Sequence, residues 1–159
     1  EPFARMNADP EVTRFLLGPI SRDKSGEFVD RLEAHFAGRG YGLWAVEVPG
    51  EAPFIGYVGL WFRDFEAHFA PAVEIGWRND LPYWGKGYAT EAARSALADG
   101  FGRVGLKEIV SFTIPANLRS IAVMERLGMT RDLDGDFDHP NVPRGDPHRR
   151  HVLYRIAAP

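Results

Sequence analysis

The sequence predicts a mixed α/β fold, with a central, mostly antiparallel sheet and flanking helices. Runs rich in β-branched and aromatic residues recur along the chain and are typical of strands. Stretches with apolar residues at helical spacing lie before and between them. A single helix separates two of the runs, which favours one parallel strand pair joined by a right-handed crossover. The expected strands are residues 41–48, 54–62, 72–78, 108–114 and 150–156.

The first elements follow in order from local signals. Pro2 suits the first turn of a helix, and no strand or clear cap stands ahead of it, so a first strand could be missing upstream of Glu1. Ser21 can cap a second helix that Gly38 and Gly40 are expected to end. The turn-forming "PGEAP" joins the first two strands, which predicts an antiparallel hairpin.

The second half of the chain alternates strands and helices. Ala89, Ala92, Ala93, Ala96 and Leu97 sit at helical spacing and give a buried face of small residues.

Asn117 can cap a further helix, and Gly128 can end it. Residues 132–148 are rich in Pro, Gly and Asp and are expected to form a long loop before the last strand. No linker divides the chain, so residues 1–159 are read as one domain.

The composition excludes several classes of function. The 159 residues contain no cysteine, so disulfides, thiolate metal sites and an acyl-cysteine intermediate are ruled out. The net charge is −3 and the basic residues are scattered, which gives no nucleic-acid footprint. No apolar run reaches the length of a membrane span and no leader precedes Glu1, so we expect a cytoplasmic protein that contacts neither membrane nor nucleic acid.

The stretch "YWGKGYATEA" is the most informative local motif. Gly85 and Gly87 allow a tight turn, the helix that follows presents unpaired amides, and Lys86 adds a positive charge. Such a loop suits an anion. The alternative is an ordinary strand-to-helix turn that needs glycine for its backbone angles. The spacing matches neither a Walker loop nor a dinucleotide fingerprint.

Two longer segments, "VEIGWRNDLPYWGKGYATEAARSAL" and "IPANLRSIAVMERLGMTRD", resemble the acetyl-CoA-binding core of the GNAT N-acetyltransferases. They are most similar to the branch of ribosomal-protein N-terminal acetyltransferases. The resemblance implies a GNAT-like fold and acetyl-CoA as cosubstrate. It places the pyrophosphate loop on Trp84, Gly85, Lys86, Gly87, Tyr88, Ala89 and Thr90, with Trp84 standing where the family has Gln or Arg.

The same resemblance implies that strands 72–78 and 108–114 splay apart to admit the pantetheine arm. The thioester then lies near Ile75, Gly76 and Trp77. Asn117 and Ser120 match family residues that contact the arm, and Ser120 matches a proton donor to the departing thiolate. As an alternative, Asn117 is also fully explained as a helix cap.

Without cysteine, the expected mechanism is direct attack of a neutral amine on the thioester in a ternary complex. Candidate bases are Glu74, Asp138 and His139. Glu74 alternates with Val73 and Ile75, so it faces the other side of the strand. Its alternative role is a carboxylate paired with a neighbouring arginine. His139 is expected in a flexible loop, where a lone histidine is more often simply exposed.

The general acid is less defined by the sequence. Many family members carry a tyrosine at the position of Met124, so Ser120 or water must protonate the thiolate, or it leaves unassisted. Glu91 suits the first turn of its helix and is assigned a structural role only. The aspartate-rich "DLDGDFD" lacks the glycine and glutamate of an EF-hand, and His148 and His151 are expected on opposite faces, so no metal site is predicted.

The acceptor stays open between a peptide N-terminus and a small-molecule amine. An alternative from another class is a module that binds acyl-CoA without transferring the acyl group. A homodimer is also considered, because the aromatic-rich "YVGLWF" would leave apolar surface to cover.

Overall fold

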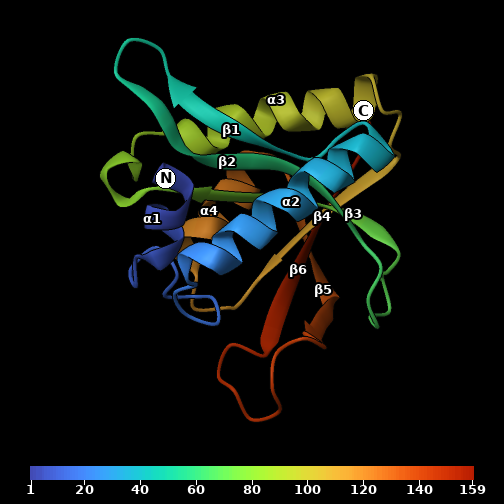
Figure 1. Cartoon of the computed structure of the whole chain (residues 1–159). Coiled ribbons are helices and arrows are strands. Elements are labelled where there is room, and N and C mark those ends of the chain that lie inside the picture. The colour runs from blue at the N-terminus through green and yellow to red at the C-terminus, as the bar shows by residue number, and fades with distance from the viewer.

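The computed structural model describes all residues from 1 to 159 and contains one six-stranded sheet (Figure 1). The strand order across the sheet is β1-β2-β3-β4-β6-β5. All neighbouring strands are antiparallel except β3 and β4, which are parallel. The bounds are β1 (Leu43–Val48), β2 (Ala52–Arg63), β3 (Ala72–Asn79), β4 (Glu108–Thr113), β5 (Thr130–Asp138) and β6 (Arg150–Ala157). The expected mixed sheet is therefore confirmed.

Helices cover both faces of the sheet. In Figure 1, α2 (Arg22–Arg39) crosses in front of the strands beside α1 (Pro2–Ala8), and α3 (Tyr88–Gly102) and α4 (Leu118–Arg126) lie behind them. A short 3₁₀ helix, η1 (Leu81–Tyr83), follows β3. The ends of α2 follow the sequence signals: the Ser21 hydroxyl accepts the Lys24 amide, and Gly40 ends the helix in the left-handed region at φ 72°. Gly38 does not stop the helix, which continues to Arg39.

The parallel pair is joined at a single point. Only Glu74 and Val110 are register partners between β3 and β4, whereas β2 pairs with β3 continuously from Gly56 to Arg63. Beside this point, the Ser111 hydroxyl on β4 donates to the Ile75 carbonyl at 2.9 Å. A side chain therefore takes the place of a backbone partner where the two strands begin to part, and the expected splay is confirmed.

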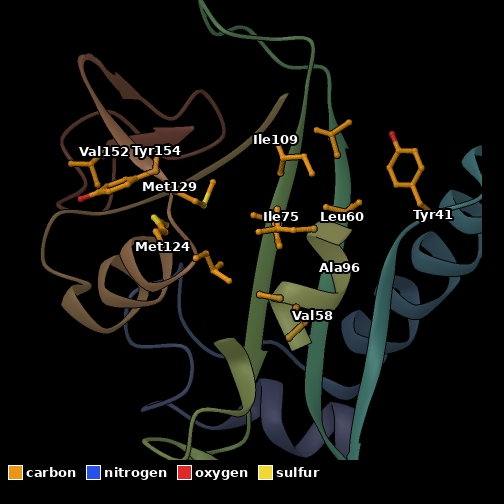
Figure 2. Packing of buried hydrophobic residues seen from close by; sticks show 14 residues of the cluster. Tyr41, Val58, Leu60, Ile75, Ala96, Ile109, Met124, Met129, Val152 and Tyr154 are labelled. Carbon is orange, nitrogen blue, oxygen red and sulfur yellow. The ribbon is translucent and has the colours of Figure 1, made fainter. Parts of the chain in front are cut away.

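The main core lies between the sheet and the α3–α4 layer (Figure 2). Leu60 of β2 and Ile75 of β3 are fully buried, Ala96 of α3 packs against them, and Met124 brings α4 onto the same cluster. A smaller cluster on the opposite face joins α1 and α2 to the sheet through the rings of Phe3, Phe28 and Tyr57. Small alanines on α3 let that helix approach the sheet closely, as its sequence predicted.

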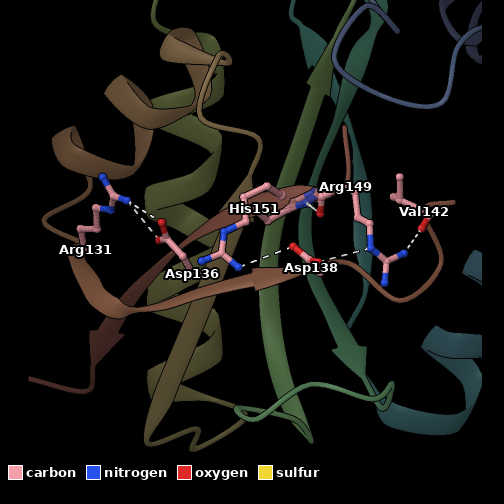
Figure 3. Close-up of polar contacts among 7 residues, drawn as sticks. Arg131, Asp136, Asp138, Val142, Arg149 and His151 are labelled. Carbon is pink, nitrogen blue, oxygen red and sulfur yellow. Dashed lines mark hydrogen bonds and ion pairs between the residues drawn. The ribbon is translucent and has the colours of Figure 1, made fainter. Parts of the chain in front are cut away.

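The expectation of a loop over residues 132–148 is wrong in its first part, because residues 130–138 form β5. Most carboxylates of this strand are balanced by arginines: Asp136 pairs with Arg131 at 2.9 Å, and Asp138 lies 3.5 Å from both Arg149 and Arg150 (Figure 3). An acidic segment can thus serve as an edge strand, since most of its charges are neutralised by arginines. The remaining residues to 149 do connect β5 to β6.

The argument for a dimer from "YVGLWF" is not supported. These residues lie in β2 between β1 and β3, where Tyr57, Val58 and Leu60 are buried and Trp61 and Phe62 are partly buried. The stretch is interior to the fold and leaves no patch that a partner must cover. None of the helices is both long and apolar enough to span a membrane.

Candidate active site

The glycine loop forms the turn into α3 with the backbone geometry that its glycines allow. Gly85 has φ 73° and Gly87 has φ 85°, both in the left-handed region. Gly87 is the N-cap of α3, and no side chain caps the helix there. The amides of Gly85, Lys86 and Gly87 donate no hydrogen bond in the loop, and those of the first helical turn have no intrahelical acceptor. The loop thus presents a row of free donors at a positive helix end.

Trp84 holds one side of this loop in place. Its indole N–H donates to the Asn79 carbonyl at 2.7 Å, so the ring is tied to the end of β3. The guanidinium of Arg119, at the start of α4, lies 4.7 Å from the centre of the ring. Arg119 is exposed and forms no salt bridge. Sequence reasoning missed this residue, since nothing local reveals that α4 begins beside the loop.

Backbone groups of β3 face the gap between the parallel strands. The Ile75 carbonyl points toward β4, as its bond from Ser111 shows. Because strand backbone groups alternate in direction, the N–H and C=O of Trp77 point to the same side, beyond the last register partner. Gly76 has ordinary backbone angles, and a β-carbon built on it would meet nothing within 4 Å. The face above Gly76 is therefore open space.

Asn117 and Ser120 stand at the start of α4, across from β3. The Asn117 side chain accepts the Ser120 amide at 3.3 Å and donates to the Thr113 hydroxyl at 3.1 Å. The capping role is therefore confirmed. The Ser120 hydroxyl accepts a hydrogen bond from the Trp77 indole N–H at 3.1 Å. Two residues expected at the thioester thus meet, although they come from different elements.

Glu74 lies on the sheet face covered by α1 and α2, opposite to the face of Val73 and Ile75. It is 8% exposed and forms an ion pair with Arg63 of β2. Burial raises the pKa of Glu74, and the charge and hydrogen bond of Arg63 oppose that rise. The alternative reading of an arginine-paired carboxylate therefore describes the resting structure. Its raised pKa and its position beside open Gly76 also suit a proton acceptor.

His139 is the first residue of the connection between β5 and β6, as expected, but its side chain is half-buried rather than simply exposed. Its amide donates to the Arg149 carbonyl at 2.8 Å. Its ring packs 5.0 Å from Phe65, 5.8 Å from Phe112 and 5.1 Å from His151. Burial, with help from nearby positive groups, lowers the pKa of His139 to about 4. The imidazole is therefore neutral at pH 7 and a weak base.

The other candidates for base and metal ligands lie apart. Asp138 is more than half exposed and sits between Arg149 and Arg150. His148 contacts Asp146 at 2.9 Å rather than His151. No group of three or more His, Cys, Asp or Glu side chains is arranged to hold a metal ion.

The site has room for two substrates. The free amides of the glycine loop suit an anion, and strands β3 and β4 part beside that loop. The buried carboxylate of Glu74 lies on the other side of the sheet. The class that this fold and site describe is an acyltransferase that uses an acyl-coenzyme A donor. Residues 1–130 match the family described as "Acetyltransferase (GNAT) domain". The chain belongs to this family of acetyl-CoA-dependent acetyltransferases.

Individual relatives agree with this assignment. YnaD of Bacillus subtilis, named as an N-acetyltransferase, is 31% identical over 94% of this chain and 82% of its own length. A GNAT-family acetyltransferase from Bacillus anthracis has a TM-score of 0.76 at 28% identity, covering 98% of this chain and 86% of its own.

Two further solved structures share the fold at lower identity. The Salmonella typhimurium protein yncA, solved with its cofactor acetyl-CoA, has a TM-score of 0.74 at 19% identity, covering 99% and 87% of the two chains. The ribosomal-protein-S5-alanine acetyltransferase of Vibrio fischeri has a TM-score of 0.71 at 21% identity, covering 99% and 88%.

The residues present fit acetyl-CoA. The free amides of the loop and the positive charges of Lys86 and Arg119 suit a diphosphate. The exposed backbone of Trp77 suits the amides of a pantetheine arm. Open space at Gly76 leaves room for the acetyl group to meet an amine.

Proposed function

We propose that this protein transfers an acetyl group from acetyl-CoA to a primary α-amine, such as a peptide N-terminus, by direct attack in a ternary complex. The observation that carries the proposal is the pairing of open space at Gly76 with the buried carboxylate of Glu74 on the same face. The donor enters from the side of α3 and α4. The amine enters from the face covered by α1 and α2.

In this mechanism the diphosphate is held by the amides from Gly85 to Thr90, with Lys86 and Arg119 as nearby cations. Tyr88 and Ala89 contribute through their backbone, because they form the first turn of α3. The Trp77 backbone, next to Ile75, guides the pantetheine arm, and its N–H donates to the oxygen that becomes negative during attack. Asn117 fixes the start of α4 and so the position of Ser120.

Glu74 acts as the base, directly or through water. Burial raises the pKa of Glu74, which makes it a better acceptor for the proton of the attacking amine, and Arg63 keeps its oxygens oriented. His139, whose pKa is lowered to about 4, packs among aromatic rings just after β5. It is the second candidate for the general base.

The choice of an α-amine rests on energetics. Deprotonating an α-amine with a pKa near 8 requires about 1.4 kcal/mol at pH 7, whereas a lysine near 10.4 requires about 4.6 kcal/mol. Glu74, a single carboxylate paired with Arg63, can more readily remove a proton from an α-amine, which needs the smaller free energy. The Vibrio fischeri relative named for an alanine of a ribosomal protein supports the same choice.

The test is a panel of peptides and small amines incubated with acetyl-CoA, with release of free CoA as the signal. We expect peptides with a free N-terminus to react, and N-terminally blocked peptides bearing lysine to react poorly. Glu74→Gln should lower kcat while the Kd for CoA stays unchanged. Glu47→Gln, on β1 away from the site, is the matched control.

Two results would argue against the proposal. CoA binding without turnover on any amine would favour a binding module that has lost transfer. If the protein preferred free small amines to peptides, the proposed acetyl transfer would stand, but the acceptor would be a small-molecule amine rather than a peptide N-terminus.

A further inference from the structure

We propose that Trp77 is a positioning residue that aims the Ser120 proton at the sulfur leaving the donor. The inference rests on the proposed function, which uses Ser120 as the proton donor. The Trp77 side chain thereby has a role of its own, whereas only the Trp77 backbone was expected to contact the donor. The two residues meet across the gap between β3 and α4.

The contact is a side-chain hydrogen bond with a defined direction. The Trp77 indole N–H can only donate, so the Ser120 oxygen must accept at 3.1 Å. Asn117 holds the other end of Ser120 by accepting its amide at 3.3 Å, and Thr113 in turn receives a bond from Asn117 at 3.1 Å. The serine is thus fixed from β3, from β4 and from its own helix cap.

This arrangement restricts the directions open to the hydroxyl proton. A serine oxygen that accepts one hydrogen bond still has its own O–H to donate. In this structure the Ser120 hydroxyl makes no second hydrogen bond. Because the indole N–H occupies one side of the oxygen, the proton is excluded from that side and stays available to an acceptor elsewhere. Met124, one turn further along α4, is 1% exposed and has no proton to offer.

In the chemical step, the amine nitrogen forms a bond to the acetyl carbon, and the carbon–sulfur bond breaks with its electron pair leaving on sulfur. The amine proton passes to Glu74 or water. The Ser120 hydroxyl gives its proton to sulfur and receives one from a solvent water in the same step, because a serine alkoxide would be far more basic than the thiolate. The products are an N-acetyl amine and the free thiol of CoA.

A purely structural role for Trp77 is the competing explanation, because its ring also packs against the main core. Trp77→Phe removes the indole N–H and keeps an aromatic ring. Trp44→Phe is the matched control, since Trp44 packs against the same core from β1 and makes no hydrogen bond to Ser120.

The test is a double-mutant cycle on kcat, KM and CoA affinity. Trp77→Phe should lower kcat about threefold to tenfold, the range expected for one lost hydrogen bond, and leave the Kd for CoA unchanged. Ser120→Ala should lower kcat further. In the Ser120→Ala background, the Trp77→Phe change should have no additional effect on kcat, and Trp44→Phe should not change kcat in either background.

Additive effects of the two substitutions would overturn the proposal, and so would a loss of CoA affinity with kcat unchanged. Nuclear magnetic resonance of the indole N–H groups tests the Trp77–Ser120 hydrogen bond independently of whether the proposed acetyl transfer occurs. Ser120→Ala should shift the Trp77 indole signal even in a protein with no measurable turnover, and an unmoved signal would refute the hydrogen bond itself.

Discussion

Arg119→Ala tests how the donor's diphosphate is held. The guanidinium lies over the Trp84 ring at 4.7 Å and has no acidic partner, so its charge is available to a phosphate. A hydrogen bond to a charged group contributes about 1.5–3 kcal/mol, and an exposed one belongs at the lower end. Since 1.4 kcal/mol corresponds to a factor of ten, the Kd for acetyl-CoA should rise about tenfold.

The assay compares two donors by calorimetry and turnover. Acetyl-CoA carries the diphosphate and S-acetyl-pantetheine does not, so only the first should lose affinity in the variant. Raising salt from about 0.1 M to 1 M shortens the Debye length from about 10 Å to 3 Å, and the gap between variant and wild type should shrink. The control is Arg31→Ala on α2, whose guanidinium also lies over a ring, that of Phe28, at 5.4 Å.

Equal losses for both donors would refute the reasoning, because Arg119 would then act through the fold. An unchanged Kd for acetyl-CoA would refute it as well, since the loop amides would then hold the diphosphate alone.

Further variants test other parts of the structure. Gly87→Ala places a side chain at φ 85°, which is unfavourable by about 1–2 kcal/mol, so we expect a melting temperature lower by about 2–8 °C together with weaker CoA binding. Burial raises the pKa of Glu74, and kcat/KM should increase with pH as that group loses its proton. Arg63→Met should shift this rise to higher pH, because the positive charge that lowers the pKa of Glu74 is removed. His35 accepts the Phe62 amide at 3.1 Å and contacts the Tyr41 carbonyl at 2.9 Å, and burial lowers its pKa. Its contribution to stability is therefore present above about pH 6.5 and is lost as the pH falls toward the folded value, and denaturant titrations of His35→Phe should show a flatter pH dependence than the wild type. Leu60→Ala removes a fully buried side chain from the core and should lower the free energy of unfolding by about 2–5 kcal/mol in the same titrations.

Local signals in the sequence predicted most of the fold. Ser21, Asn117 and Gly40 act within a few residues, so their effects on helix ends could be read directly. The positive angles of Gly85 and Gly87 were likewise implied by residue type. Strand β5 was missed because its stability depends on partners distant in the chain. Asp132, for example, is bonded by Arg155 at 2.8 Å, and no local pattern reveals that pairing.

The same distinction applies to the site. Glu74 could be placed on its strand face by alternation, because that rule is local. Its ion pair with Arg63 depends on the register of β2 against β3, and the contact between Trp77 and Ser120 depends on how α4 packs. The packing of His139 was not predicted for a similar reason, since the aromatic rings around it come from β4, β6 and the connection between β2 and β3.

The single rung between β3 and β4 divides the sheet into two three-stranded halves. A donor molecule that spans this seam touches both halves, so its binding energy adds to their cohesion. Slow amide exchange should therefore extend along the inner edges of β3 and β4 when CoA is added. In a variant destabilised elsewhere in the sheet, the free energy of unfolding should rise with the logarithm of the CoA concentration once that concentration exceeds the Kd.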